Sequence, residues 1–241
     1  MRKRGFDLES YPPRPRPFAS EAFRQLYDRN KPNTMVAWSG LHTAHLSAEY
    51  VVTNNIPGDI VECGVWRGGC SVLMAETLAE MKTGDRDLFL FDTFSGMPAP
   101  TNEDKQATSG IPASIKFKRL FDAGEKWDEA SLDQVESTVS NANYPRNRFH
   151  LVEGLVEETI PAEAPDSIAL LRLDTDWYES TRHEMEHLFP RLSPGGVLII
   201  DDYGVWAGAR QAVDEYIGAN SIQILLTQDA LNGAAVGIKQ P

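Results

Sequence analysis

The stretch DIVECGVWRGG, residues 59–69, decides the fold of this chain. Its first half is a short, mostly apolar run of the kind found in strands buried in a parallel sheet. Its second half contains three glycines, which permit a tight turn and let a ligand approach the backbone closely. A helical segment at 69–81 follows directly. A strand, a glycine-rich turn and a helix in this order predict the first unit of an open α/β sheet.

The same alternation of strand and helix continues along the chain. Further strands are predicted at 87–92, 148–153, 168–174, 197–201, 222–227 and 234–239. Further helices are predicted at 128–141, 179–190 and 206–217. Strands that alternate with helices form a parallel sheet covered on both faces. We therefore expect one Rossmann-like α/β domain with a seven-stranded, mostly parallel sheet whose last hairpin is antiparallel.

The N-terminal region does not follow this alternation. Residues 1–33 form an arm rich in proline and arginine, with one short helix expected at 20–27. A second helix, capped by Thr34, is expected to run to about Asn55. Because extended arms often serve dimerisation, we expect a homo-oligomer.

These patterns divide the chain into two regions. Residues 1–56 are the N-terminal arm and helical extension, and residues 57–241 are the main domain. Within the main domain, residues 95–127 are an insertion of weak periodicity with scattered Gly, Pro and Lys. We expect the extension and the insertion, like a lid, to cover the active site.

The composition excludes several classes of function. The 241 residues carry 23 Lys and Arg against 35 Asp and Glu, a net charge of −12, whereas nucleic-acid binding depends on clustered positive charge. No apolar stretch approaches the roughly 18 residues that cross a bilayer, and no signal-type segment follows the start. The two cysteines, Cys63 and Cys70, suit a reducing compartment. We expect a cytoplasmic protein that binds neither nucleic acid nor membrane.

The turn after the first strand predicts part of a ligand site. Its glycines have neither the spacing of the dinucleotide fingerprint nor the lysine of a P-loop. Glu62, just before them, would repel a pyrophosphate and suit a cationic ligand. Asp92 ends the next strand, where a carboxylate can accept hydrogen bonds from ribose hydroxyls. S-Adenosylmethionine, with its ribose, ammonium and sulfonium groups, fits this pattern. The alternative is a turn that merely joins strand to helix.

Acidic residues also end the fourth and fifth predicted strands. Asp174 closes one, and the pair Asp201 and Asp202 closes the other. If these strands are neighbours in a parallel sheet, the three carboxylates lie close together. A few carboxylate oxygens, with room for water and substrate, suit Mg²⁺ or a similar hard cation. The alternative is that such acidic residues cap the following helices. For Asp176, helix capping and a role at the active site are equally favoured. Ser180 is a second candidate for the cap of the same helix.

Four separated segments carry a resemblance to a known family. They are DIVECGVWRGG (59–69), FDTFSGMP (91–98), LRLDTDWYEST (171–181) and LSPGGVLIIDDY (192–203). Together they resemble the macrocin O-methyltransferase family, whose members methylate sugar hydroxyls of natural-product glycosides with S-adenosylmethionine and Mg²⁺. The resemblance runs from about residue 34 to residue 217 and implies a class I methyltransferase fold.

The resemblance also implies roles for single residues. Asp174, Asp201 and Asp202 would hold the metal ion, and Asp174 would also act as general base. Glu62, Gly64 and Asp92 would contact the cofactor. Gly68 in the same turn and Gly154 after the third predicted strand are expected to join them. The expected cofactor contacts are therefore Glu62, Gly64, Gly68, Asp92 and Gly154. The aromatic residue that often follows this last glycine in the family is absent here.

Two other functions stay open from the sequence. A phenolic or catechol hydroxyl could be the acceptor, although metal-dependent catechol methyltransferases usually carry lysine where this chain has Trp177. The other alternative is a non-catalytic nucleoside-binding protein. Three like charges kept close together are energetically costly and would serve no purpose in such a protein, which argues against it.

Three further patterns allow either a functional role or an ordinary structural one. The segment HEMEH (183–187) fits the zinc-protease motif, but its helix is expected to pack behind the sheet. His42 and His45 could line an acceptor pocket or lie at a surface or interface. A basic group in the insertion could meet an anionic acceptor such as a nucleotide sugar, although a solvated loop is favoured. Its members are Lys105, Lys116, Lys118 and Arg119.

Overall fold

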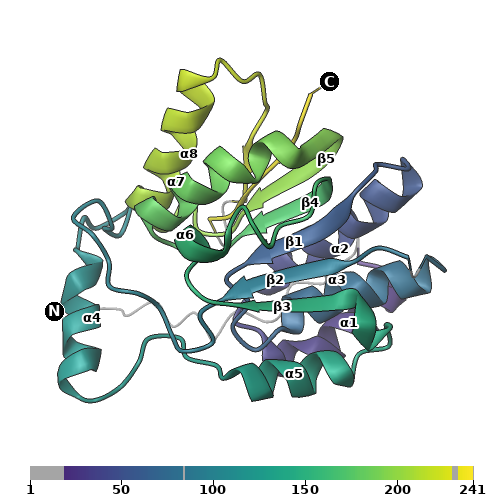
Figure 1. The fold of residues 1–241 in the computed structure, drawn as a ribbon, viewed down its shortest axis with the longest axis horizontal. Helices are drawn as coiled ribbons and strands as arrows, with labels where there is room; N and C mark the ends of the chain where they lie inside the picture. Colours follow the sequence, from purple (N-terminus) through teal and green to yellow (C-terminus); the bar gives the residue numbers. More distant parts are fainter. Residues whose placement is uncertain (1–18, 84, 230–232, 241) are drawn as a thin grey trace, which may run out of the picture.

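Seven strands form one sheet, in the order β3-β2-β1-β4-β5-β7-β6, in the computed structural model, which describes residues 19–83, 85–229 and 233–240 (Figure 1). Strands β1 to β5 pair in parallel, β7 is antiparallel to β5, and β6 is antiparallel to β7. This confirms the predicted seven-stranded, mostly parallel sheet. The strands are β1 (Asp59–Cys63), β2 (Leu88–Asp92), β3 (Phe149–Glu153), β4 (Ile168–Leu173), β5 (Leu192–Ile200), β6 (Thr227–Gln228) and β7 (Ala235–Ile238).

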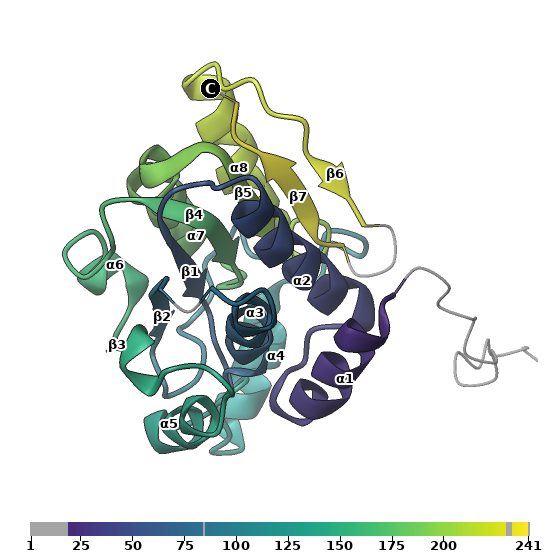
Figure 2. The ribbon, with the colours of Figure 1, turned by 90° about the vertical axis from the view of Figure 1, so that its right-hand side faces the viewer.

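Helices cover both faces of the sheet (Figure 2). One face carries α1 (Glu21–Asn30), α2 (Trp38–Thr53), α3 (Gly69–Glu80) and α5 (Leu132–Ser140). The other carries α6 (Val156–Thr159), α7 (Tyr178–His187) and α8 (Ala207–Ala219). Short 3-10 turns lie at Lys31–Asn33, Arg146–Arg148 and Phe189–Arg191. Within the described ranges, no helix is both long and apolar enough to span a bilayer.

The chain order of the strands creates a switch point between β1 and β4. The sheet grows from β1 through β2 to β3, and the chain then returns to place β4 on the other side of β1. In open α/β sheets, ligands bind at the carboxyl ends of the strands beside such a point. Helix α4 (Ala113–Asp122), from the insertion, stands apart from the other helices on the side toward which the parallel strands point (Figure 1).

Alternate strand residues contribute to two separate cores, one on each face of the sheet. Ile60 packs in the core with α2 and α3, and its neighbour Val61 packs in the core with α7 and α8. All six residues of β4 are buried, which explains its nearly continuous apolar sequence. The exception in that strand is Arg172, a buried charge that must find partners.

Some boundaries differ from the prediction. Helix α2 begins at Trp38 and Thr34 does not cap it, because the Thr34 hydroxyl accepts the N–H of Val36 at 3.1 Å instead. The insertion contains α4, a helix that is not among those predicted from the sequence. Its Ala113 is buried, and Phe117 and Leu120, on the same helix face, are partly buried against the same apolar cluster. The last two strands are also shorter than predicted, with two and four residues. Residues 1–18 of the arm lie outside the described part.

Candidate active site

A cavity of about 530 Å³ opens where the parallel strands end. This size is typical of small-molecule sites. Its wall comes from the turns after β1, β2, β3, β4 and β5, from the residues before α2, and from the insertion. The predicted site residues on this wall are Gly64, Asp92, Gly154, Asp174, Asp201 and Asp202.

Gly64 brings the turn after β1 against the end of β4. Its φ is +79°, and a Cβ atom at this position would lie 2.1 Å from the carbonyl oxygen of Asp174. The N–H of Asp174 donates to the carbonyl oxygen of Cys63 at 2.8 Å. Only glycine fits there, and it leaves bare backbone on the cavity wall. Gly68, by contrast, is the N-cap residue directly before α3 and faces Val135 of α5, not the cavity.

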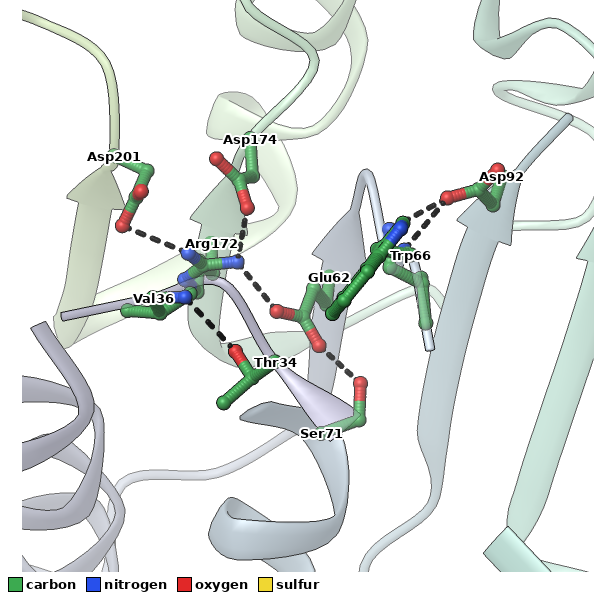
Figure 3. A network of polar contacts seen from close by, with 10 residues as sticks. Thr34, Val36, Glu62, Trp66, Ser71, Asp92, Arg172, Asp174 and Asp201 are labelled. Atoms are coloured by element: carbon green, nitrogen blue, oxygen red, sulfur yellow. Dashed lines mark hydrogen bonds and ion pairs between the residues drawn. The ribbon is translucent and has the colours of Figure 1, made fainter. Parts of the chain in front are cut away.

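Asp92 fixes the turn that follows β1 (Figure 3). Its Oδ2 accepts the N–H groups of Val65 at 2.7 Å and Trp66 at 3.0 Å, and its Oδ1 accepts that of Phe94 at 2.8 Å. Trp66 and Phe94 both have a φ of +47°, so these bonds hold a locally strained backbone. Because a carboxylate has about four acceptor positions, Asp92 retains capacity toward the cavity.

Arg172 is the centre of a buried ionic network (Figure 3). Its Nη1 donates to Oε1 of Glu62 at 2.5 Å and to Oδ2 of Asp174 at 2.8 Å. Its Nη2 lies 2.7 Å from Oδ1 of Asp201 but makes no well-oriented hydrogen bond among the described residues. The second oxygen of Glu62 accepts the hydroxyl of Ser71. The guanidinium thus orients two of the predicted metal ligands.

This network changes the interpretation of Glu62. The side chain is 1% exposed, its two oxygens are occupied by Arg172 and Ser71, and it is not part of the cavity wall. Burial raises the pKa of Glu62, and the Arg172 charge lowers it in part. The sequence interpretation gave Arg172 no role. An arginine within the otherwise apolar run IALLRL is a sequence signal for a buried charge, but its pairing with Glu62 follows only from the sheet register.

Three carboxylates face one another in the cavity. Oxygen atoms of Asp174, Asp176 and Asp202 all lie within 4.8 Å of one another. Burial raises the pKa of Asp176 to about 7. Burial and the neighbouring Asp176 raise the pKa of Asp202 well above its usual value. Closely spaced acidic groups whose charged forms are disfavoured fit a hard divalent cation, which supplies the missing positive charge.

The third member of this cluster is Asp176 and not the predicted ligand Asp201, which is paired with Arg172. Neither Asp176 nor Ser180 caps the following helix: α7 begins after Trp177, which makes no side-chain cap. The first N–H of α7, from Tyr178, instead donates to Oδ1 of Asp104 in the insertion at 2.8 Å. Asp176, with a φ of +67°, instead interacts with Asp202 in the acidic cluster.

Asp104 also ties the insertion to the domain. Its side chain is fully buried, and its Oδ2 accepts both the N–H and the hydroxyl of Thr101 at 2.6 and 2.8 Å. Next to it, three tryptophans from different segments meet edge to face, with ring centroids 5.1 to 5.9 Å apart. These are Trp127, Trp177 and Trp206. Trp127 and Trp206 line the cavity, so the insertion supplies part of its wall.

The histidine patterns do not reach the cavity, whereas Lys116 of the basic group lies on its wall. His45 is buried against α3, with its Nδ1 2.9 Å from the Thr77 hydroxyl, and His42 packs on Phe23. In the segment 183–187, Glu184 points into the protein whereas the Nε2 of His183 lies 2.9 Å from the carbonyl oxygen of Ile160. The ring centroids of His183 and His187 lie 4.3 Å apart, but among the described residues no third ligand joins them, as a zinc-protease site requires.

Comparison with known proteins connects this cavity to a family. A family model described as macrocin O-methyltransferase matches residues 18–234. A demethyldecarbamoylnovobiocin O-methyltransferase from Streptomyces niveus is 33% identical over 76% of this chain and 67% of its own. An 8-demethyl-8-(2,3-dimethoxy-alpha-L-rhamnosyl)-tetracenomycin-C 4'-O-methyltransferase from Streptomyces olivaceus is 35% identical over 79% of this chain and 69% of its own. A mycinamicin III 3''-O-methyltransferase from Micromonospora griseorubida is 32% identical over 76% of this chain and 70% of its own.

Solved structures agree with the architecture. The O-methyltransferase NovP superimposes with a TM-score of 0.74 at 29% identity, covering 87% of this chain and 83% of that one. The calicheamicin methyltransferase CalS11 has a TM-score of 0.60 at 21% identity, covering 97% of both chains, and shares the fold. The sheet and its helices are those of a Rossmann-like class I methyltransferase. The chain belongs to the macrocin O-methyltransferase family and is an O-methyltransferase.

Proposed function

We propose that this protein transfers a methyl group from S-adenosylmethionine to a hydroxyl of a sugar or glycosylated natural product, with Mg²⁺ or a similar divalent ion. The observation that carries the proposal is the acidic wall of the cavity that also contains Gly64 and Asp92. Its members are Asp174, Asp176, Asp201 and Asp202, and oxygen atoms of the first, second and fourth lie within 4.8 Å of one another. One cavity thus joins a cation site to a wall suited to a nucleoside.

The relatives support a sugar acceptor. The tetracenomycin enzyme is named for a rhamnosyl substrate and for methylation at its 4' position. The mycinamicin enzyme is named for a 3'' position. A catechol remains the weaker alternative, because Trp177 is buried against the insertion and its indole N–H donates to the carbonyl oxygen of Pro98 at 3.0 Å. No lysine stands there to assist a phenol.

The cofactor would lie across the turns after β1, β2 and β3. Gly64 offers a close backbone approach, Asp92 offers carboxylate oxygens for ribose hydroxyls, and Gly154 lies on the same wall. Glu62 and Gly68 would act indirectly, since Glu62 positions Arg172 and Gly68 is the N-cap residue of α3. S-Adenosylmethionine would supply the methyl group as an electrophilic sulfonium.

Asp174, Asp201 and Asp202 would hold the metal ion. Asp174 and Asp201 follow strand ends and are both oriented by Arg172, as outer partners commonly orient metal ligands. Asp176 lies on the loop beyond β4 and would face the acceptor from beside the ion. A divalent ion there would acidify a bound hydroxyl and stabilise its developing negative charge.

The proposed reaction needs one proton transfer and one displacement. Asp174 would take the proton of the acceptor hydroxyl as general base, a contribution of about 10² to 10⁴ in rate. The hydroxyl oxygen then forms a bond to the methyl carbon while the carbon–sulfur bond breaks. The sulfonium becomes a neutral thioether. The carboxylates would also hold the acceptor oxygen in line with the methyl group.

The test is methyl transfer from labelled S-adenosylmethionine to a panel of sugars, glycosides and catechols. We expect label in a sugar-bearing acceptor, loss of transfer in EDTA, and recovery with excess Mg²⁺. Label in catechols alone would overturn the sugar assignment. Full transfer in EDTA would overturn the metal assignment.

A further inference from the structure

A second cavity, of about 280 Å³, adjoins the acceptor side of the active site. The two cavities share Lys116, Trp127 and Trp206 on their walls. The second cavity continues from these residues along α4 to Arg119. A group attached to a sugar at the acidic cluster can therefore extend past Lys116 into this side cavity.

The two cavities differ in charge. Seven carboxylate residues line the main cavity, and Lys116 is the one lysine or arginine among its described lining residues. The side cavity is lined by two cationic residues, Lys116 and Arg119, and by no carboxylate among the described residues. In a chain with a net charge of −12, this local reversal favours an anionic group.

The cations of α4 differ in their partners. Lys118 pairs with Asp122 at 2.8 Å, whereas neither Lys116 nor Arg119 has a carboxylate partner in the described part of the chain. The ammonium of Lys116 lies 3.7 Å from the centroid of the Trp127 ring. Because residues three apart lie on one side of a helix, Lys116 and Arg119 face the same space.

Apolar side chains complete the side cavity. Ile111 and Ile115 line it and are 50% and 62% exposed, so that both offer apolar surface to a ligand. Pro112 lies between them in the same wall. Two cations without carboxylate partners beside an apolar surface fit a ligand that has both an anionic and a flat apolar part.

We propose that the acceptor is a nucleotide-activated sugar whose diphosphate binds Lys116 and Arg119. The inference rests on the proposed function, because the sugar would occupy the acidic cluster. The diphosphate would then lie at the junction of the two cavities, and the base would pack on Ile111 and Ile115. The two cations would also offset repulsion between the diphosphate and the acidic wall.

The test compares a nucleoside diphosphate sugar with the neutral methyl glycoside of the same sugar. In Lys116→Ala and Arg119→Ala, we expect the ratio of kcat/KM for the charged acceptor over the neutral one to fall about tenfold each. Lys118→Ala is the matched control on the same helix and should leave both values unchanged. An unchanged ratio in the double variant would overturn the inference.

A binding measurement separates this inference from the proposed function. Thymidine diphosphate, titrated by calorimetry, should bind the wild-type protein and the Lys118→Ala variant equally and the double variant at least about tenfold more weakly. The double substitution could leave both thymidine diphosphate binding and use of the nucleoside diphosphate sugar unchanged while neutral glycosides are methylated. This result would refute the diphosphate site at Lys116 and Arg119 and leave the proposed function standing. Binding of the diphosphate that depends on Lys116 and Arg119, without methyl transfer to any sugar, would refute the proposed function and leave only the diphosphate site standing.

Discussion

Arg172 of β4 lies opposite Glu62 of β1 in the sheet register, and the two form an ion pair in which neither side chain is more than 2% exposed. The pair joins the two strands that flank the switch point. The same guanidinium reaches Asp174 and Asp201, so one buried cation connects the sheet interior to the acidic wall of the cavity.

Removing this cation should be costly. Arg172→Met leaves Glu62 as a buried carboxylate without its cation, and we expect a loss of about 3–5 kcal/mol in the free energy of unfolding, measured in urea. In a Glu62→Gln background the same substitution should cost clearly less, because no charge is left buried at that position. Equal costs in the two backgrounds would show that the pair is not coupled.

Gly64 tests how tightly the turn after β1 fits. Gly64→Ala combines a positive φ with a Cβ atom 2.1 Å from a backbone oxygen, so we expect a loss above about 3 kcal/mol. Gly110→Ala is the matched control, since Gly110 has a φ of +67° but no atom within 4 Å of its added Cβ. It should cost only about 1 kcal/mol. Similar losses would mean that backbone strain alone matters.

The metal ligands can be ranked by calorimetric titration with Mg²⁺. Asp174→Asn, Asp201→Asn and Asp202→Asn should each weaken binding at least about tenfold, as loss of a ligand or its support does. Asp176→Asn should weaken it less. If Asp176→Asn costs as much as Asp202→Asn while Asp201→Asn costs nothing, the ligands are the three clustered carboxylates. Asp174→Asn should also lose most activity while cofactor binding persists.

The sequence predicts much of this molecule because strand ends are local signals. The apolar run before Asp174 and the glycines after Glu62 identify both strands and the edge where they end. Pairing across the sheet is different. The partner of Glu62 lies 110 residues away, and the residue that binds the N-terminus of α7 is Asp104, 74 residues before it. Such long-range contacts leave no local periodicity, which is why sequence reasoning misses both roles.

The buried carboxyl group of Glu184 should make the free energy of unfolding depend on pH. It is fully buried on α7, where it accepts the hydroxyl of Thr175 at 3.0 Å, and it faces Cys63 of β1 and Glu157 of α6. Burial raises its pKa from 4.5 to about 8, and the Thr175 hydroxyl opposes this only in part. The folded protein therefore keeps a proton that the unfolded chain has lost between these pH values.

The contribution of Glu184 to stability is thus greatest at low pH and declines as pH rises from about 4.5 to about 8. A glutamine at this position does not titrate, so the Glu184→Gln variant should gain stability relative to the wild type over this range, by up to about 1.4 kcal/mol per pH unit. Urea unfolding of both proteins at several pH values measures the difference. A constant difference across this range would show that Glu184 is already ionised in the folded protein.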